Sequence, residues 1–162
     1  MRVKNKLLLI MLIVTLSFIA VSCINVVSAT TEINENYTLN ADSTEAIVVK
    51  SGSNVTIDLN GYNLTVDGDA ITVESGATAT IRGSDSKVNS TQGAVVNLGG
   101  TVTIESGTYN SSEWYTIKNL ANMTIKGGVF TQDTNNTGNS SLIANGWYNG
   151  KTSSENDRNV PV

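Results

Sequence analysis

Apolar and polar residues alternate in short segments along this chain, and the segments recur in a longer phrase. Four rows align: AIVVKSGSNVTIDLNGYNLTVDGD from Ala46, AITVESGATATIRGSDSKVNSTQG from Ala70, AVVNLGGTVTIESGTYNSSEW from Ala94 and YTIKNLANMTIKGGVFTQ from Tyr115. The row starts lie 24, 24 and 21 residues apart, and a fifth start is expected near Leu142, 27 residues further on. A repeat of this length is typical of a solenoid, in which each row forms one coil.

The centre of each row is a β-branched segment. These segments are VTID from Val55, ATIR from Ala79, VTIE from Val102 and MTIK from Met123. Because successive side chains of a strand point to opposite faces, we expect the first and third residues of each segment inside and the threonines outside. Short β-branched segments divided by Gly, Asn, Asp and Ser favour strands over helices.

A third apolar segment follows each central one. It contains Leu64 and Val66 in the first row, Val88 in the second, and Tyr109 or Phe130 in the last two. Three short strands in each row of 21–27 residues predict an all-β fold, a short single-stranded parallel β-helix of about five coils. A β-sandwich is the alternative, but it does not predict one three-strand phrase at a coil-length period. Tyr109 and Phe130 recur at one position, which predicts that their rings stack within the packing.

The fourth residue of the central segment changes sign from row to row. This position holds Asp58, Arg82, Glu105 and Lys126, all on the expected outer face. Neighbouring coils of a parallel ladder lie about 4.8 Å apart, so opposite charges attract along this column. We therefore interpret Arg82 as part of a structural charge ladder that sets the register, rather than as a catalytic arginine.

The N-terminus predicts export. Three basic residues precede an uncharged run from Leu7 to Ala29, and small residues stand at the positions a signal peptidase reads, Val27 and Ala29. We interpret residues 1–29 as a signal peptide cleaved after Ala29, which predicts a secreted or cell-surface protein. One alternative is a lipoprotein in which Cys23 carries the lipid, and another is an uncleaved anchor.

Removal of this segment changes the composition. The remaining chain has no cysteine and no histidine, which excludes a disulfide framework and a Cys/His zinc site. Lys and Arg fall from 10 to 7 while Asp and Glu stay at 14, so the net charge changes from −4 to −7. Because phosphates need a basic face, this acidic chain argues against nucleic acid as a partner.

The remaining chain suits one domain with two different ends. Residues 30–45 are expected to form an N-terminal cap or lead-in, residues 46–148 the β-helix, and residues 149–162 a polar tail. The tail, KTSSENDRNVPV, resembles an unfinished loop more than a cap. Because solenoids need capped ends, we expect a truncated chain, or one whose C-terminal end meets further coils or a second copy.

The phrases NVTIDLNGYNLTV, GGTVTIESGTYN and NMTIKGGVF span roughly Ala46 to Phe130. They resemble the pectate-lyase-like β-helix region of large secreted or surface adhesin-like proteins of anaerobic bacteria and archaea. The resemblance implies an exported structural or adhesive module, with glycans or a host or cell surface as partners. The alternative is a fragment of a polysaccharide-active enzyme, or its carbohydrate-binding region.

The sequence does not support the enzymatic alternative. Pectate lyases of this fold carry acidic calcium ligands and a basic catalytic residue on one sheet, and polygalacturonases carry NTD, DD, GHG and RIK motifs. This chain has none of those four motifs, and its acidic residues do not cluster within one phrase. Because acid and base catalysis needs two titrating groups across a substrate, we assign no catalytic residue, and no cofactor is expected apart from the calcium ion considered next.

The triplet Asp67-Gly68-Asp69 is the one candidate for a cation. Its two carboxylates straddle a glycine, and carboxylate oxygens are the ligands that Ca²⁺ takes in proteins. The same triplet is also typical of a plain turn, in which Asp side chains cap backbone amides.

Two aromatic pairs stand apart from the repeat. Trp114-Tyr115 lies in NSSEWY and Trp147-Tyr148 lies in ANGWYNG, both among polar residues. Aromatic rings at a solenoid edge can stack on sugar rings, so these four residues are candidate carbohydrate contacts. Alternatively, they cover the open side or end of a thin core.

Asn-X-Ser/Thr sequons are frequent, and most coincide with the turns and strands of the repeat. If the organism has the machinery, these asparagines are glycosylation candidates: Asn36, Asn54, Asn63, Asn89, Asn110, Asn122, Asn135 and Asn139.

Overall fold

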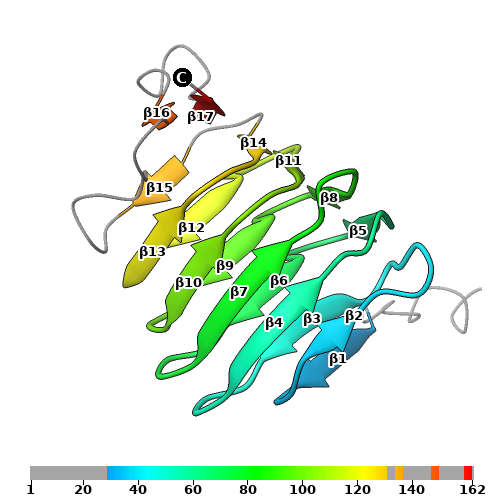
Figure 1. The fold of residues 1–162 in the computed structure, drawn as a ribbon. Coiled ribbons are helices and arrows are strands. Elements are labelled where there is room, and N and C mark those ends of the chain that lie inside the picture. The colour runs from blue at the N-terminus through cyan, green and yellow to red at the C-terminus, as the bar shows by residue number, and fades with distance from the viewer. Residues whose placement is uncertain (1–28, 131–133, 137–146, 150–158, 162) are drawn as a thin grey trace, which may run out of the picture.

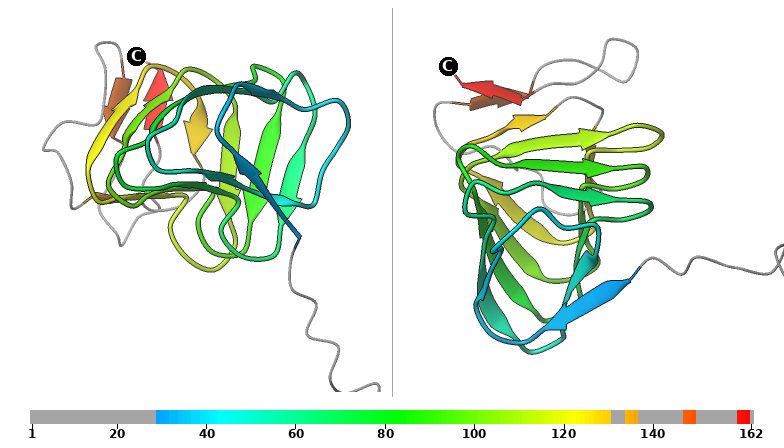
Figure 2. Two further views of the ribbon diagram at one scale, coloured as in Figure 1. Left: turned by 90° about the horizontal axis from the view of Figure 1, so that it is seen from below. Right: turned by 90° about the vertical axis from the view of Figure 1, so that its right-hand side faces the viewer.

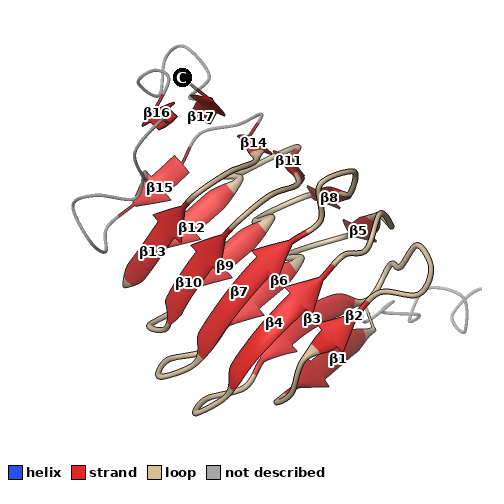
Figure 3. Ribbon diagram, viewed as in Figure 1, coloured by secondary structure: helices blue, strands red, loops and turns tan. Residues whose placement is uncertain are grey.

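The chain winds into a parallel β-helix of about four turns with three sheets (Figure 1). The structure, a computed structural model, describes residues 29–130, 134–136, 147–149 and 159–161. Strands and loops make up all of this described part (Figure 3), and it contains no helix able to cross a membrane. The predicted all-β solenoid with three strands per coil is therefore confirmed, and the β-sandwich is excluded.

Three sheets of parallel strands form the faces of the solenoid. The first contains β1 (Thr30–Ile33), β3 (Ala46–Val49), β6 (Ile71–Val73), β9 (Val95–Asn97), β12 (Ile117–Asn119) and β15 (Thr134–Asn136). The second contains β2 (Tyr37–Thr38), β4 (Asn54–Asp58), β7 (Thr78–Arg82), β10 (Thr101–Ile104) and β13 (Asn122–Ile125). The third contains β5 (Leu64–Val66), β8 (Lys87–Ser90), β11 (Thr108–Ser111) and β14 (Val129–Phe130).

The views of Figure 2 show these coils stacked one upon another. Two further strands, β16 (Trp147–Asn149) and β17 (Asn159–Pro161), pair with each other in antiparallel fashion. Residues 30–45, expected as an N-terminal cap or lead-in, contain β1, which pairs with β3, and β2, which pairs with β4.

Register in the second sheet follows the alternation in the sequence. Four isoleucines, one from each coil, face one another and are fully buried: Ile57, Ile81, Ile104 and Ile125. Their inner neighbours two residues earlier, Val55 among them, are at most 2% exposed. The predicted inner face is confirmed, because only one face of each strand meets the core.

Aromatic packing closes the third sheet. The rings of Tyr109 and Phe130 stack with centroids 5.1 Å apart and planes 11° apart, as expected. The Tyr109 hydroxyl donates a hydrogen bond to the Ser106 carbonyl at 2.7 Å. Burial raises the pKa of the Tyr109 phenol, because desolvation disfavours its anion.

The predicted start of the fourth row is wrong by one residue. Ile117 faces Val95, so Thr116 and not Tyr115 occupies the place of Ala94. The corner between β11 and β12 has gained one residue, which an alignment by similarity of rows does not reveal.

The first sheet also continues earlier than expected. Thr134 of β15 pairs with Ile117, whereas a new row was expected near Leu142, which lies outside the described residues. The part of the chain that the structure describes forms about four turns, whereas about five coils were expected for the chain as a whole.

Two asparagines replace aliphatic residues inside the solenoid. Asn97 and Asn119 are fully buried, in the column that holds Val49 and Val73 in the earlier coils. The Asn97 side-chain amide donates to Oδ1 of Asn119 at 2.7 Å, and its own Oδ1 accepts from the amide of Gly100 at 2.8 Å. The buried polar groups are thus paired, as stability requires.

Candidate functional site

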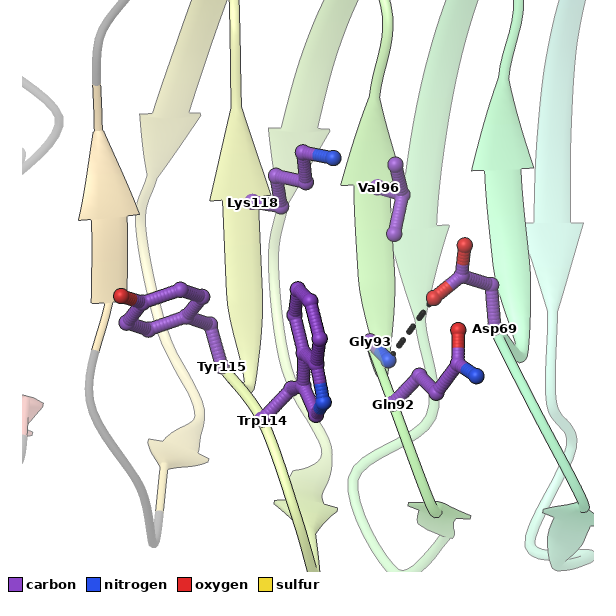
Figure 4. A pocket seen from close by; sticks show the side chains of 7 residues that line it. All are labelled: Asp69, Gln92, Gly93, Val96, Trp114, Tyr115 and Lys118. Atoms are coloured by element: carbon purple, nitrogen blue, oxygen red, sulfur yellow. Dashed lines mark hydrogen bonds between the residues drawn. The ribbon is translucent and has the colours of Figure 1, made fainter.

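A hollow lies on the surface where the third sheet turns into the first (Figure 4). Three successive corners contribute to it, so that residues far apart in sequence become neighbours. The second sheet lies outside this surface. The lining consists of Asp69, Gln92, Gly93, Val96, Trp114, Tyr115 and Lys118.

An aromatic and an aliphatic side chain supply the apolar surface of the hollow. Trp114, after β11, is 63% exposed, which is the largest exposure of any large hydrophobic residue in the described part of the chain. Val96 occupies an outward position of β9, between the buried Val95 and Asn97, yet it is only 2% exposed. Val96 therefore lies at the bottom of the hollow and gives it an apolar surface beside Trp114.

Close packing around Gly93 determines the shape of the hollow between Asp69 and Val96. The Gly93 amide donates to Oδ1 of Asp69 at 2.9 Å, which joins two corners. A Cβ at Gly93 would lie 2.5 Å from Cγ2 of Val96 and 2.9 Å from the Asp69 carboxylate. Only glycine fits there without displacing the residues around the hollow.

Polar groups of three kinds surround this apolar surface. Asp69 contributes a carboxylate, Gln92 an amide and Lys118 an ammonium. Among the described residues, the Lys118 ammonium forms no ion pair, and the Gln92 side-chain amide forms no hydrogen bond with protein groups.

The hollow unites two features that the sequence suggested separately. Trp114 and Tyr115 were candidate sugar contacts and Asp69 a candidate cation ligand, and all three line it. The second aromatic pair, Trp147 and Tyr148, lies on β16, for which the structure describes the backbone only.

The triplet containing Asp69 forms a turn tied to the next coil. Asp67 Oδ1 accepts from the Thr91 hydroxyl at 3.0 Å, and Thr91 Oγ1 accepts from the Gly68 amide at 2.7 Å. Gly68 has a φ of 120°, which favours glycine. In the described part of the chain, no three Asp, Glu, His or Cys side chains gather as metal ligands. Calcium at Asp67 and Asp69 remains a prediction.

The column of alternating charges forms two ion pairs. Arg82 contacts the Asp58 carboxylate at 2.9 Å, and Lys126 approaches Glu105 at 3.8 Å. Between Arg82 and Glu105, both of which the structure describes, no ion pair forms. The column lies on the second sheet, away from the hollow.

A second charge cluster escaped the sequence analysis. Lys50 contacts Glu74 of the next coil at 2.6 Å and Glu32 of the preceding one at 3.4 Å. The hydrogen bond between Lys50 and Glu74 raises the pKa of the lysine and lowers the pKa of the Glu74 carboxyl. The row alignment places Lys50 beside Glu74, so this pair could have been found from the sequence.

The sequon asparagines occupy different environments. Asn54 and Asn122 are exposed at the starts of β4 and β13. In contrast, Oδ1 accepts a backbone hydrogen bond in Asn36 and Asn63, and Asn110 donates to Asn89 at 2.8 Å. Asn135 lies on β15, and Asn139 lies outside the described residues.

Sequence reasoning missed Gln92, Gly93, Val96 and Lys118. The pairing of β9 with β12 could have indicated two of these residues as neighbours, because Lys118 faces Val96 on the adjacent strand. Trp114 lies in the corner that holds one extra residue, a feature that the alignment of rows does not show. Comparisons with protein-family models, with curated proteins and with solved structures find no match to this chain.

Proposed function

We propose that this protein is an exported, non-catalytic adhesive module that binds a glycan through the hollow around Trp114. One observation carries the proposal: a tryptophan that is 63% exposed shares a hollow with a carboxylate, an amide and an ammonium side chain. An apolar platform with a few convergent polar groups is the usual composition of a small-molecule site.

The chemistry of the lining suits a sugar ring. A pyranose presents C–H groups on its faces and hydroxyl groups around its edge. The Trp114 indole can pack against such a face, while Asp69 can accept, and Gln92 and Lys118 can donate, hydrogen bonds at the edge. Loss of the ring would therefore remove most of the contact surface.

The solenoid supports this role by holding the site on a rigid base. Corner residues from three coils are attached to strands that pair on both sides, for example β9 between β6 and β12. A site built on such elements loses little conformational entropy when a ligand binds. Export, inferred from residues 1–29, would place the site where extracellular glycans occur.

A glycan array tests the proposal. The chain expressed from its full coding sequence is applied to neutral and acidic polysaccharides, alongside Trp114→Ala and Trp147→Ala variants. We expect binding, and a loss of about tenfold or more in Trp114→Ala, since buried aromatic contacts dominate binding energy. The matched control is Tyr62→Ala, an exposed aromatic residue (36%) outside the hollow, which should bind as the parent does.

Two outcomes would overturn the proposal. One is the absence of binding to any glycan, and the other is unchanged binding in a variant that combines the two tryptophan substitutions. The same samples are incubated with a soluble uronan, with and without calcium. Cleavage of the uronan would favour the alternative, a fragment of a polysaccharide-active enzyme.

A further inference from the structure

The corner that presents Trp114 is longer than the equivalent corners. Four residues lie between Val66 and Ile71, and four also lie between Ser90 and Val95. Between Ser111 and Ile117 there are five, although the flanking strands stay in register, with Ser111 facing Ser90 and Ile117 facing Val95. One extra residue is thus inserted where the tryptophan leaves the coil.

A buried hydroxyl ties this longer corner to the one beneath it. Ser111 is 4% exposed. Its Oγ donates to the carbonyl of Gln92 and accepts from the amide of Trp114, the latter at 3.3 Å. Two residues that line the hollow, from successive coils, are therefore joined through one side chain.

The equivalent residues in the earlier coils do not make this connection. The column that ends in Ser111 contains Val66 and Ser90. Val66 has no hydroxyl, and the Ser90 hydroxyl donates to the carbonyl of Asn110, within the neighbouring strand, at 3.2 Å. The two hydrogen bonds of the Ser111 hydroxyl, which we call the Ser111 clamp, therefore occur only at the long corner among these three.

We propose that Ser111 is a positioning residue that holds Trp114 and Gln92 in the arrangement that binds ligand. The backbone of the long corner pairs with the preceding corner through the amides of Ser112 and Glu113, and the Ser111 hydroxyl adds bonds to one further amide and one carbonyl. This inference rests on the proposed function for its biological meaning. The ordering of Trp114 by Ser111, however, can be measured without a ligand.

Fluorescence of a single tryptophan tests the inference. The chain contains two tryptophans, so Trp147→Phe leaves Trp114 as the only one. Ser111→Ala in this background should increase the amplitude of the fast anisotropy decay of Trp114 about twofold, because local ring motion occurs on this nanosecond scale. Ser90→Ala, the same change in the same column, should leave the decay unchanged, and Ser111→Thr should restore it.

A second readout links the clamp to binding. On the glycan array, Ser111→Ala should weaken binding about tenfold, the effect expected of losing one or two hydrogen bonds, with a circular-dichroism melting curve close to that of Ser90→Ala. An unchanged anisotropy decay in Ser111→Ala, or an equal change in Ser90→Ala, would overturn the inference. If the decay changes and no glycan binds, the clamp stands and the proposed function fails.

Discussion

Asn97 shows how a single residue can connect several backbone segments inside this fold. Its amide group donates to Asn119 and also to the carbonyl of Asn122 at 3.0 Å, while its oxygen accepts from the amides of Gly99 and Gly100. Valine fills the same column in the first two full coils. The change to asparagine coincides with the tight Leu98-Gly99-Gly100 turn, whose amides need an acceptor.

Replacement of Asn97 by valine should be strongly destabilising. The substitution keeps approximate volume but removes the bond to Oδ1 of Asn119, which still accepts from Ala121, and takes away the side-chain acceptor of the Gly99 and Gly100 amides. We expect the free energy of unfolding, measured by urea denaturation, to fall by about 2–4 kcal/mol, since each buried polar group left unpaired costs about 1–3 kcal/mol. Asn54→Val, at an exposed strand start, should change it by less than about 0.5 kcal/mol. Equal effects in the two variants would contradict this account.

At the scale of the strand, cross-strand pairs along a column hold neighbouring coils in register. In the second sheet, Asp58 of β4 faces Arg82 of β7, and Nε of the arginine donates to the aspartate at 3.0 Å. Both side chains are partly exposed. Since water screens such pairs, their contribution is small compared with that of the buried isoleucines.

Arg82→Glu should loosen this register modestly. It places three carboxylates in one column, so attraction to Asp58 becomes repulsion. We expect a loss of about 1 kcal/mol in low salt, and less in high salt because of screening. Arg82→Gln, which removes the attraction only, should lose about half as much. Stability of Arg82→Glu equal to that of the parent in low salt would refute the charge-ladder interpretation, and glycan binding should be unaffected.

For the molecule as a whole, the strands that the structure describes in the three sheets pair with strands of adjacent coils. A central strand such as β7 has partners on both sides, β4 and β10, whereas β1 ends the first sheet and pairs with β3 alone among the described strands. Solenoid stability is approximately a sum of such nearest-neighbour interfaces. The hollow lies on the corners before β6, β9 and β12, and each of these three strands has a partner strand on both sides.

Hydrogen exchange should report this arrangement. Amides of β7 and β10 should exchange slowest, and those of β1 fastest, because an end strand can open without disrupting two interfaces. Mass spectrometry of peptic peptides can measure the gradient from β1 to β7. A uniform exchange rate along the chain would show instead that the solenoid opens as a single unit.

The architecture, and the inner and outer faces of most strands, follow from the amino-acid pattern alone. A period of two within each strand and about 24 between rows leaves one arrangement that buries Ile57, Ile81, Ile104 and Ile125 together. The stacking of Tyr109 on Phe130 follows from the same repeat. These features are predictable because local alternation and long-range register agree.

The register at the corner between β11 and β12 and the composition of the hollow emerge only in the folded chain. Similar polar residues around Tyr115 and Thr116 allow two alignments that differ by one residue, and packing of Ile117 against Val95 selects between them. Asp69 and Trp114 line the same hollow because the coils stack. Their relative position depends on the length of every corner between them. Site geometry is therefore sensitive to single insertions that hardly alter the hydrophobic pattern.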